Sequence, residues 1–255
     1  MSPALKDKVA IITGGGRGLG RAFALRFAEE GAKLLLPDIS LERAEGVAKE
    51  IRTKGGEAVA MKTDISDENA TKKMAEKVVQ QYGKVDILVN NAAIYYGIEA
   101  KPWDAWTVEE WDRIFAVNVR GTWLCCKAIA PLMIKQSSGK IINITSDVFK
   151  SPDSQFFLAY ALGKAAVYTL THSLAAALGP SGINVNAIAP GYTATEASLS
   201  QSGSEQLFEN VIGAQFIKRR EEPQDVVGTA VFLASKDSDF ITGQLILING
   251  GHIML

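Results

Sequence analysis

Short apolar runs alternate with longer amphipathic stretches along the whole chain. In the short runs, consecutive positions are apolar, which is typical of strands in a sheet that is covered on both faces. The strands predicted from these runs cover residues 9–13, 33–37, 58–62, 87–89, 140–144, 183–188 and 245–248. The stretches between them predict helices at 18–30, 41–54, 68–82, 108–134, 159–178 and 225–233, where 108–134 forms one long helix or two closely joined ones.

This strand–helix alternation predicts the fold class. It indicates an α/β protein with a Rossmann-type, doubly wound parallel sheet of seven strands and helices on both faces. The sequence contains no linker, repeat or low-complexity segment, so residues 1–255 are predicted to form a single domain. The longest irregular segment, 192–216, is rich in Ser, Thr, Glu and Gln, and we expect it to be a lid or a flexible loop.

Composition narrows the class of partner. The chain has 255 residues, of which 47% are hydrophobic and 22% charged, and its net charge is −1, so nucleic acid and anionic membranes are not expected as partners. No apolar run approaches about 20 residues and the start does not resemble a signal peptide, so we expect a cytoplasmic protein. Cys125 and Cys126 are adjacent and are predicted to be reduced core residues. Neither His172 nor His252 belongs to a cluster with metal-ligand spacing, so no metal is predicted.

The segment 159–178 carries the first candidate chemistry. Tyr160 and Lys164 are four residues apart, so they project from one face of the predicted helix, and Ser146 lies at the end of the strand before it. A free phenol ionises only near pH ~10, and an ammonium held close favours the phenolate and lowers its pKa. Tyr160 is therefore a candidate acid or base, although the same spacing is common on solvated helix faces.

A glycine-rich turn joins the first predicted strand to the first helix. Its sequence is TGGGRGLG at 13–20, which includes Gly14, Arg17, Gly18, Leu19 and Gly20. Glycines let the backbone approach a pyrophosphate closely, and the helix N-terminus supplies free N–H groups and a partial positive charge. The strand–turn–helix context predicts a dinucleotide-binding turn.

Asp38 ends the second predicted strand, about twenty residues after the glycines. A carboxylate there accepts hydrogen bonds from the adenosine ribose hydroxyls and repels a 2′-phosphate. Ile39 follows, so no Arg is placed to receive that phosphate, and NAD is favoured over NADP. Two alternatives stay open: Arg17 could bind a phosphate, and Asp38 could cap the following helix.

Taken together, these motifs resemble the classical short-chain dehydrogenase/reductase family over essentially the whole chain. TGGGRGLG matches the family's TGxxxGxG turn, and the Ser146, Tyr160 and Lys164 set matches its Ser and YxxxK. The other matches are Asp64-Ile65, the NNAA segment with Asn91 and Ala92, Asn118 in FAVNVRG, the PGYTAT segment with Pro190, Gly191, Thr193 and Thr195, and ITGQLILINGG at 241–251. Within the family, the NNA and IIN stretches are similar to NAD-dependent secondary alcohol dehydrogenases of the 1-phenylethanol type.

The resemblance implies a role for each matched residue. Tyr160 would exchange the proton, Lys164 would lower its pKa and bind the nicotinamide ribose, and Ser146 would hold the substrate oxygen. Asn118 would hold a relay water, and Thr195 would bind the carboxamide. The residues implied in cofactor binding are Gly14, Arg17, Gly18, Leu19, Gly20, Asp38, Asp64, Ile65, Asn91, Ala92, Tyr160, Lys164, Pro190, Gly191, Thr193 and Thr195.

Two departures from the family pattern bear on the site. Ala93 replaces the last Gly of NNAG, which places a Cβ beside the cofactor; we expect it to be tolerated. The connection from Ser146 to Tyr160 is one residue longer than usual, which makes Thr145 and Asp147 rivals for the place of the catalytic hydroxyl. Thr145 should face away from Ser146 if the strand persists, and an ionised Asp147 cannot donate, so Ser146 is retained.

Aromatic residues gather in the loops that should follow the strands, where such sheets bind ligands. They are Tyr95, Tyr96, Trp103, Trp106, Phe149, Phe156, Phe157 and Tyr192. They indicate an apolar pocket for a hydrophobic or aromatic alcohol or ketone, or alternatively subunit contacts. The resemblance also implies a homo-oligomer, most often a tetramer.

The leading hypothesis is an NAD-dependent secondary alcohol dehydrogenase or ketone reductase. A 3-oxoacyl thioester reductase is the alternative, and it would prefer NADPH and a basic surface for an acyl carrier. A non-catalytic NAD-binding regulatory protein is the hypothesis from another class, against which the complete set of Asn118, Ser146, Tyr160 and Lys164 argues.

Overall fold

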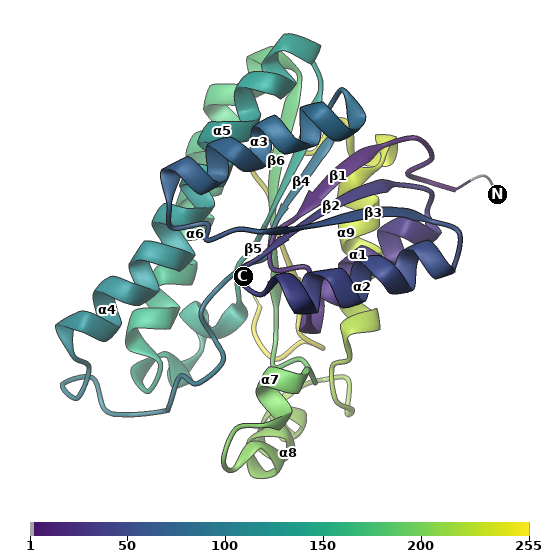
Figure 1. The fold of residues 1–255 in the computed structure, drawn as a ribbon. Coiled ribbons are helices and arrows are strands. Elements are labelled where there is room, and N and C mark those ends of the chain that lie inside the picture. Colours follow the sequence, from purple (N-terminus) through teal and green to yellow (C-terminus); the bar gives the residue numbers. More distant parts are fainter. Residues whose placement is uncertain (1–2, 255) are drawn as a thin grey trace.

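The computed structural model describes residues 3–254. These residues contain a seven-stranded sheet in the order β3-β2-β1-β4-β5-β6-β7, and every neighbouring pair is parallel (Figure 1). The strands are β1 (Val9–Ile12), β2 (Lys33–Asp38), β3 (Glu57–Lys62), β4 (Ile87–Asn90), β5 (Gly139–Ile144), β6 (Ile183–Pro190) and β7 (Leu245–Ile248). The predicted fold class is confirmed.

Helices cover both faces of the sheet, in two layers. One core cluster joins β-strand residues to α1 (Gly18–Glu29), α2 (Leu41–Thr53) and α9 (Pro223–Ala234). The other joins them to α3 (Glu68–Tyr82), α5 (Thr122–Gln136) and α6 (Leu158–Leu178). Ile11 packs in one cluster and its neighbour Ile12 in the other, because successive strand residues point to opposite faces. Both faces are buried, which explains why the strands are apolar at consecutive positions.

The order of the strands reverses beside β1. β1 pairs with β2 on one side and with β4 on the other, so the connections that follow these strands diverge at their carboxyl ends. In open α/β sheets, this divergence leaves a crevice in which ligands bind.

Two predicted segments differ in detail from the structure. The stretch predicted as 108–134 is α4 (Val108–Phe115), a π-helical turn (Ala116–Gly121) and α5, which are continuous with one another. The segment 192–216 is not irregular throughout, because it holds the helices α7 (Glu196–Leu199) and α8 (Ser204–Ala214), which lie together at one end of the molecule (Figure 1). Neither the π-helical turn nor these two short helices has a strong hydrophobic periodicity in the sequence.

Within residues 3–254, no helix is long and apolar enough to span a membrane, and no cluster of His, Cys, Asp and Glu side chains could hold a metal ion.

Candidate active site

A cavity of about 720 Å³ opens at the carboxyl ends of the strands, where the strand order reverses. Its wall includes every residue that the sequence implicates in cofactor binding, together with Ser146, Tyr160 and Lys164. Asn118 alone among the predicted site residues lies outside this wall. The fold thus gathers residues from positions 14 to 195 of the chain around one cavity.

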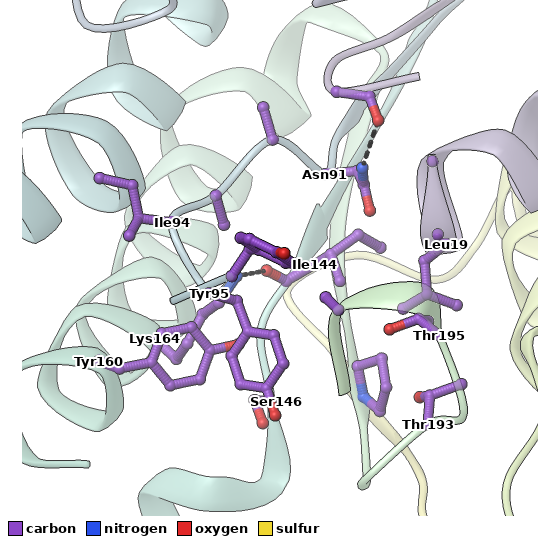
Figure 2. Close-up of a pocket in the computed structure, with 18 of the residues that line it drawn as sticks. Leu19, Asn91, Ile94, Tyr95, Ile144, Ser146, Tyr160, Lys164, Thr193 and Thr195 are labelled. Carbon is purple, nitrogen blue, oxygen red and sulfur yellow. Dashed lines mark hydrogen bonds between the residues drawn. The ribbon is translucent and has the colours of Figure 1, made fainter. Parts of the chain in front are cut away.

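The glycine turn after β1 is packed too closely for side chains. Gly14 has φ +65°, and a Cβ at Gly20 would lie 2.0 Å from the carbonyl oxygen of Gly14. The Asn91 amide donates to the carbonyl oxygens of Thr13 at 3.0 Å and Gly14 at 3.2 Å, which fastens the turn to the end of β4 (Figure 2). The backbone of the turn is held open to the cavity, as a pyrophosphate requires.

Asp38 is buried at the end of β2, and both oxygens of its carboxylate accept a hydrogen bond from the backbone. It accepts hydrogen bonds from the N–H of Gly16 at 3.0 Å and of Ser40 at 2.9 Å. Helix α2 is capped by the Ser40 side chain, so the alternative in which Asp38 caps it is wrong. Asp38 instead presents a negative charge to the cavity beside the glycine turn.

Although Ile39 follows Asp38, an Arg does lie near the Asp38 carboxylate, so the expectation that no Arg is placed to receive a 2′-phosphate stays open. The Arg43 guanidinium, on the first turn of α2, lies 3.4 Å from the Asp38 carboxylate, lines the cavity and is 40% exposed. Helical geometry brings it there, since a residue five positions after a strand end can turn back over that end. The residue next to Asp38 gives no sign of this arginine, whereas the first turn of the predicted helix contains it.

The adenine end of the cavity carries one unsatisfied polar group. The hydroxyl of Thr63 is buried in the wall and has no hydrogen-bond partner within the described residues. Next to it, Ile65 is buried, and Asp64 is exposed and accepts hydrogen bonds from the backbone and hydroxyl of Ser66. A buried hydroxyl without a partner is costly, so a ligand with a polar group here would satisfy it.

At the other end, Tyr160 and Lys164 project from the first turns of α6. The Lys164 ammonium donates to the carbonyl oxygen of Ile144 at 2.8 Å and lies 5.6 Å from the centre of the Tyr160 ring (Figure 2). Both side chains are buried, and burial lowers the pKa of Lys164 to about 8. The ammonium is thereby held at the strand end, close to the phenol.

Burial raises the pKa of Tyr160 in the protein alone, the negative charge of Asp147 raises it further, and a hydrogen bond with Ser146 acts in the opposite direction. Tyr160 therefore keeps its proton at neutral pH. The Lys164 ammonium bonds to the carbonyl oxygen of Ile144 and not to the phenol oxygen. The predicted effect of Lys164 on the phenol stays a prediction.

Ser146 faces the cavity. Neither of its two rivals offers a free hydroxyl, because Thr145 is hydrogen-bonded and Asp147 carries a carboxylate. The Ser146 oxygen accepts a bond from the N–H of Val148 at 3.3 Å, so its proton stays available for donation. Thr145 is buried and donates to the carbonyl oxygen of Ile188 at 3.0 Å. The geometry brings Ser146, and not Thr145, to the Tyr160 phenol.

Asn118 lies behind the cavity wall, in the π-helical turn. Its side chain pairs with the backbone of Ile94, accepting from the N–H at 2.7 Å and donating to the carbonyl at 3.1 Å. Its own carbonyl accepts from the hydroxyl of Thr122 at 2.8 Å. Asn118 therefore braces the loop after β4, and its predicted relay role stays a prediction.

The segment 190–195 is anchored by Glu221. The Thr193 hydroxyl donates to the Glu221 carboxylate at 2.7 Å, and the N–H of Gly191 donates at 3.1 Å. Burial raises the pKa of Glu221 to about 7. Thr195 caps α7, whose first residue, Glu196, accepts a bond from the N–H of Gly18 at 3.1 Å. The segment 192–216 is thus joined to the glycine turn.

The predicted aromatic residues divide into two groups. Tyr95, Tyr96, Phe157 and Tyr192 line the cavity. The ring of Tyr95 lies 5.2 Å from that of Tyr160, and the hydroxyls of Tyr95 and Tyr192 both reach the amide of Gln201 in the lid. Trp103, Trp106, Phe149 and Phe156 lie outside the cavity wall.

The sequence did not predict that Asp147, Asn249 and His252 form a polar cluster at the substrate end. His252, in the C-terminal tail, lines the cavity, and its Nδ1 lies 3.2 Å from the Asp147 carboxylate. Asn249 donates to the same carboxylate at 3.1 Å. No local pattern signals this cluster, because Asp147 and His252 are 105 positions apart.

A buried phenol, ammonium and hydroxyl at one end of a glycine-lined trough define a nicotinamide-dependent oxidoreductase with a Rossmann-type fold. Comparisons with known proteins agree: a family model described as Enoyl-(Acyl carrier protein) reductase matches residues 14–252. The chain belongs to the short-chain dehydrogenase/reductase family.

Individual relatives match along nearly the whole chain. The 3-oxoacyl-[acyl-carrier-protein] reductase FabG of Staphylococcus epidermidis is 37% identical over 97% of this chain and 100% of its own. The (2S)-[(R)-hydroxy(phenyl)methyl]succinyl-CoA dehydrogenase subunit BbsD of Thauera aromatica is 35% identical over 97% of each. Levodione reductase has a similar structure, with a TM-score of 0.91, 31% identity, and coverage of 97% of this chain and 98% of that one. A putative NAD(P) dependent gluconate 5-dehydrogenase from Beutenbergia cavernae, with bound NADP at low occupancy, also gives 0.91, at 32% identity and 99% coverage of both.

Proposed function

We propose that this protein interconverts a hydrophobic or aromatic secondary alcohol and its ketone, with NAD(H) as the cofactor. The observation that carries the proposal is the meeting of Ser146, Tyr160 and Lys164 in one cavity with the Asp38 carboxylate at its far end. The aromatic wall of Tyr95, Phe157 and Tyr192 supports an apolar substrate. The name of the Thauera aromatica relative includes a hydroxy(phenyl)methyl group, which is consistent with this class.

The residues of the chain fit a nicotinamide dinucleotide. Gly14, Gly18 and Gly20 would let the pyrophosphate approach the backbone, Asp38 would accept from the ribose hydroxyls, and Thr63 would gain the partner that it lacks. When bound, this cofactor accepts or supplies the hydride. The protein orients the reacting groups and handles the proton.

Ketone reduction follows from the protonation states. Tyr160 keeps its proton at neutral pH, so its hydroxyl can act as the acid that protonates the substrate oxygen. Ser146 donates a hydrogen bond to the same oxygen and stabilises the charge that develops on it. Lys164, still cationic below about pH 8, favours the phenolate that remains. Alcohol oxidation uses the same groups in reverse.

A 3-oxoacyl thioester reductase that uses NADPH is the second candidate. Arg43 beside Asp38 favours it, because a guanidinium at this end of the cavity can pair with a ribose 2′-phosphate. The FabG relatives and the structure with bound NADP point the same way. The Asp38 carboxylate, buried and bound to the glycine turn, opposes the phosphate and makes NAD our first choice.

A matched set of assays separates these candidates. The purified protein is assayed with NADH and NADPH against acetophenone, cyclohexanone and acetoacetyl-CoA. Faster turnover of acetophenone with NADH supports the proposal, and faster turnover of acetoacetyl-CoA with NADPH supports the second candidate. Tight NADH binding without turnover of any probe would favour the non-catalytic NAD-binding regulatory protein.

Oligomeric state and location are part of the same proposal. We propose a cytoplasmic homo-oligomer, most simply a tetramer, as the family resemblance implies. Light scattering of the purified protein measures the mass directly, and a monomer would contradict it.

A further inference from the structure

The C-terminal tail places an imidazole in the wall of the cavity. Residues 249–252 turn sharply at Gly250 and Gly251, whose φ values are +60° and +80°. The carbonyl oxygen of Gly250 accepts the N–H groups of Phe216 and Ile217, each at 2.9 Å, which fixes the tail against the end of the lid. A Cβ at Gly251 would lie 2.5 Å from the Phe216 ring, so the two segments are closely packed. The backbone directly before His252 is therefore held in place by these contacts.

The environment of His252 orients its two ring nitrogens differently. An ionised carboxylate only accepts hydrogen bonds, so Nδ1, which lies 3.2 Å from Asp147, carries a proton. Nε2 has no hydrogen-bond partner among the described residues and is not among the buried unsatisfied atoms, so it is accessible, and His252 lines the cavity. The hydrogen bond to Asp147 also raises the pKa of His252, which favours the form with protons on both nitrogens.

The position of this group relative to Ser146 determines what it can contact. Asp147, which holds the imidazole, is the residue next to Ser146, and both line the cavity. A donor that shares the cavity wall with Ser146 and with aromatic side chains matches a substrate with a second oxygen acceptor near the reacting carbon. A plain aryl ketone would leave this donor without a partner.

We infer that His252 is a substrate-binding residue whose Nε2–H donates to a second acceptor oxygen of the substrate, such as an ester, thioester or carboxylate oxygen near the reacting carbonyl. This inference rests on the proposed function and narrows its substrate class from ketones in general to ketones with a neighbouring carbonyl group. It holds for both candidates, since an aryl β-keto ester and a 3-oxoacyl thioester share this feature.

Two ketones that differ only in the second carbonyl test the inference. Acetophenone and ethyl benzoylacetate are compared by kcat/KM in the wild type, His252→Phe and His252→Gln, with His172→Phe on the exposed face of α6 as the matched control. The preference for the ester should fall roughly tenfold in His252→Phe, as for loss of a hydrogen bond to a charged donor, while the acetophenone value stays within about twofold. His252→Gln, which keeps a donor, should recover part of the preference. Equal losses for both ketones would show that His252 only supports the fold and would overturn the inference.

A pH series gives a second readout. Asp147 retains the Nδ1 proton, so deprotonation removes the proton from Nε2 and converts it from a donor to an acceptor. The preference for the ester should therefore decrease as the pH rises through the raised pKa of His252. Asp147 and Asp153 are the ionisable groups that act on His252, and Glu221 and Tyr160 interact with the same Asp147. The pKa of Glu221 is raised to about 7. A pH dependence that persists in His252→Gln would belong to Glu221 and would contradict the assignment.

Binding measurements separate this inference from the proposed reaction. Calorimetric titration of ethyl benzoylacetate and acetophenone into the protein with bound cofactor measures recognition without turnover. If neither ketone is reduced but the ester still binds through His252, only the proposed reaction fails. If His252→Phe binds both ketones as the wild type does, the inference fails whatever the reaction.

Discussion

The cofactor half of the cavity and its substrate half are constructed from different kinds of contact. At the ends of β1, β2 and β4, side chains bond to the backbone of the glycine turn, as Asp38 does to Gly16 and Asn91 to Thr13. At the ends of β5 and β6, side chains also bond to one another, as Asp147 does to His252 and Thr193 to Glu221. Backbone contacts at strand ends depend on the fold alone. The substrate half depends on which side chains this particular chain carries.

The largest effect is expected from the loss of the Tyr160 phenol oxygen, which should impair the substrate half and leave the cofactor half intact. Tyr160→Phe should lower kcat by about 10²- to 10⁴-fold, because the acid that protonates the substrate oxygen is lost. NADH binding, measured by fluorescence titration, should change less than about twofold, since the phenol lies at the other end from the glycine turn. Tyr168→Phe, further along α6 and stacked on Phe149, is the matched control. A Tyr160→Phe enzyme with most of its activity would refute the assignment.

The second effect belongs to the cofactor half alone. Asp38→Ala should reduce the preference for NAD over NADP by roughly 10- to 100-fold, since a charged acceptor for the ribose is lost and Arg43 is released. Arg43→Ala should shift the ratio the other way, by removing the only positive charge that the structure pairs with Asp38. Ratios of kcat/KM for the two cofactors measure both changes. An unchanged ratio in Asp38→Ala would show that this carboxylate does not select the cofactor.

A smaller effect comes from the charge on Lys164. Its pKa is lowered to about 8, so the cation that supports the phenolate is present below that pH and is lost above it. The rate of ketone reduction, measured at saturating cofactor, should fall about tenfold per pH unit beyond 8. The free energy of unfolding should change in the opposite direction. The pKa of an unfolded lysine is near 10.4, so unfolding takes up a proton between pH 8 and 10. The protein should therefore become more stable as the pH rises through this range. A reduction rate that stays constant to pH 10 would contradict the role of the cation.

The smallest effect concerns the anchor of the substrate half. Burial raises the pKa of Glu221 to about 7, so folding takes up a proton at this carboxyl between pH 4.5 and 7. The contribution of the protonated carboxyl to stability is present below pH 4.5 and is lost as the pH rises to 7. Glu221→Gln should remove that loss and raise the melting temperature at pH 8 by about 2–4 °C, with little change at pH 5. Glu209→Gln, on the exposed side of α8, is the control. A melting temperature that changes equally at both pH values would show that the charge is not the cause.

The sequence predicted the sheet and most of the cavity wall because both depend on local signals. Apolar runs identify buried strands, and glycines between a strand and a helix identify a turn that approaches a phosphate. Arg43 could not be predicted from the residue after Asp38, because it lies five positions after Asp38, on the first turn of α2. His252 could not be predicted, since its contact with Asp147 depends on how the tail folds back across the finished sheet.

The pKa of Tyr160 shows a different limit of the sequence. The spacing of Tyr160 and Lys164 correctly placed both on one face of α6, but the direction of the shift depends on burial and on Asp147, neither of which the spacing reveals. A charged group close in sequence can shift a pKa, but the loss of solvent on burial decides the direction of the overall shift.

The π-helical turn between α4 and α5 has a consequence for how this chain tolerates length changes. A π turn accommodates one residue more than an α turn, and Asn118 reaches Ile94 from inside it. Deleting one residue between Ala116 and Gly121 would close this turn to ordinary α-helical winding and change the direction in which the side chains inside it point. The Asn118 amide would then move away from the loop after β4, although α4 and α5 would remain helical. This helical segment should therefore accept many substitutions but no deletion.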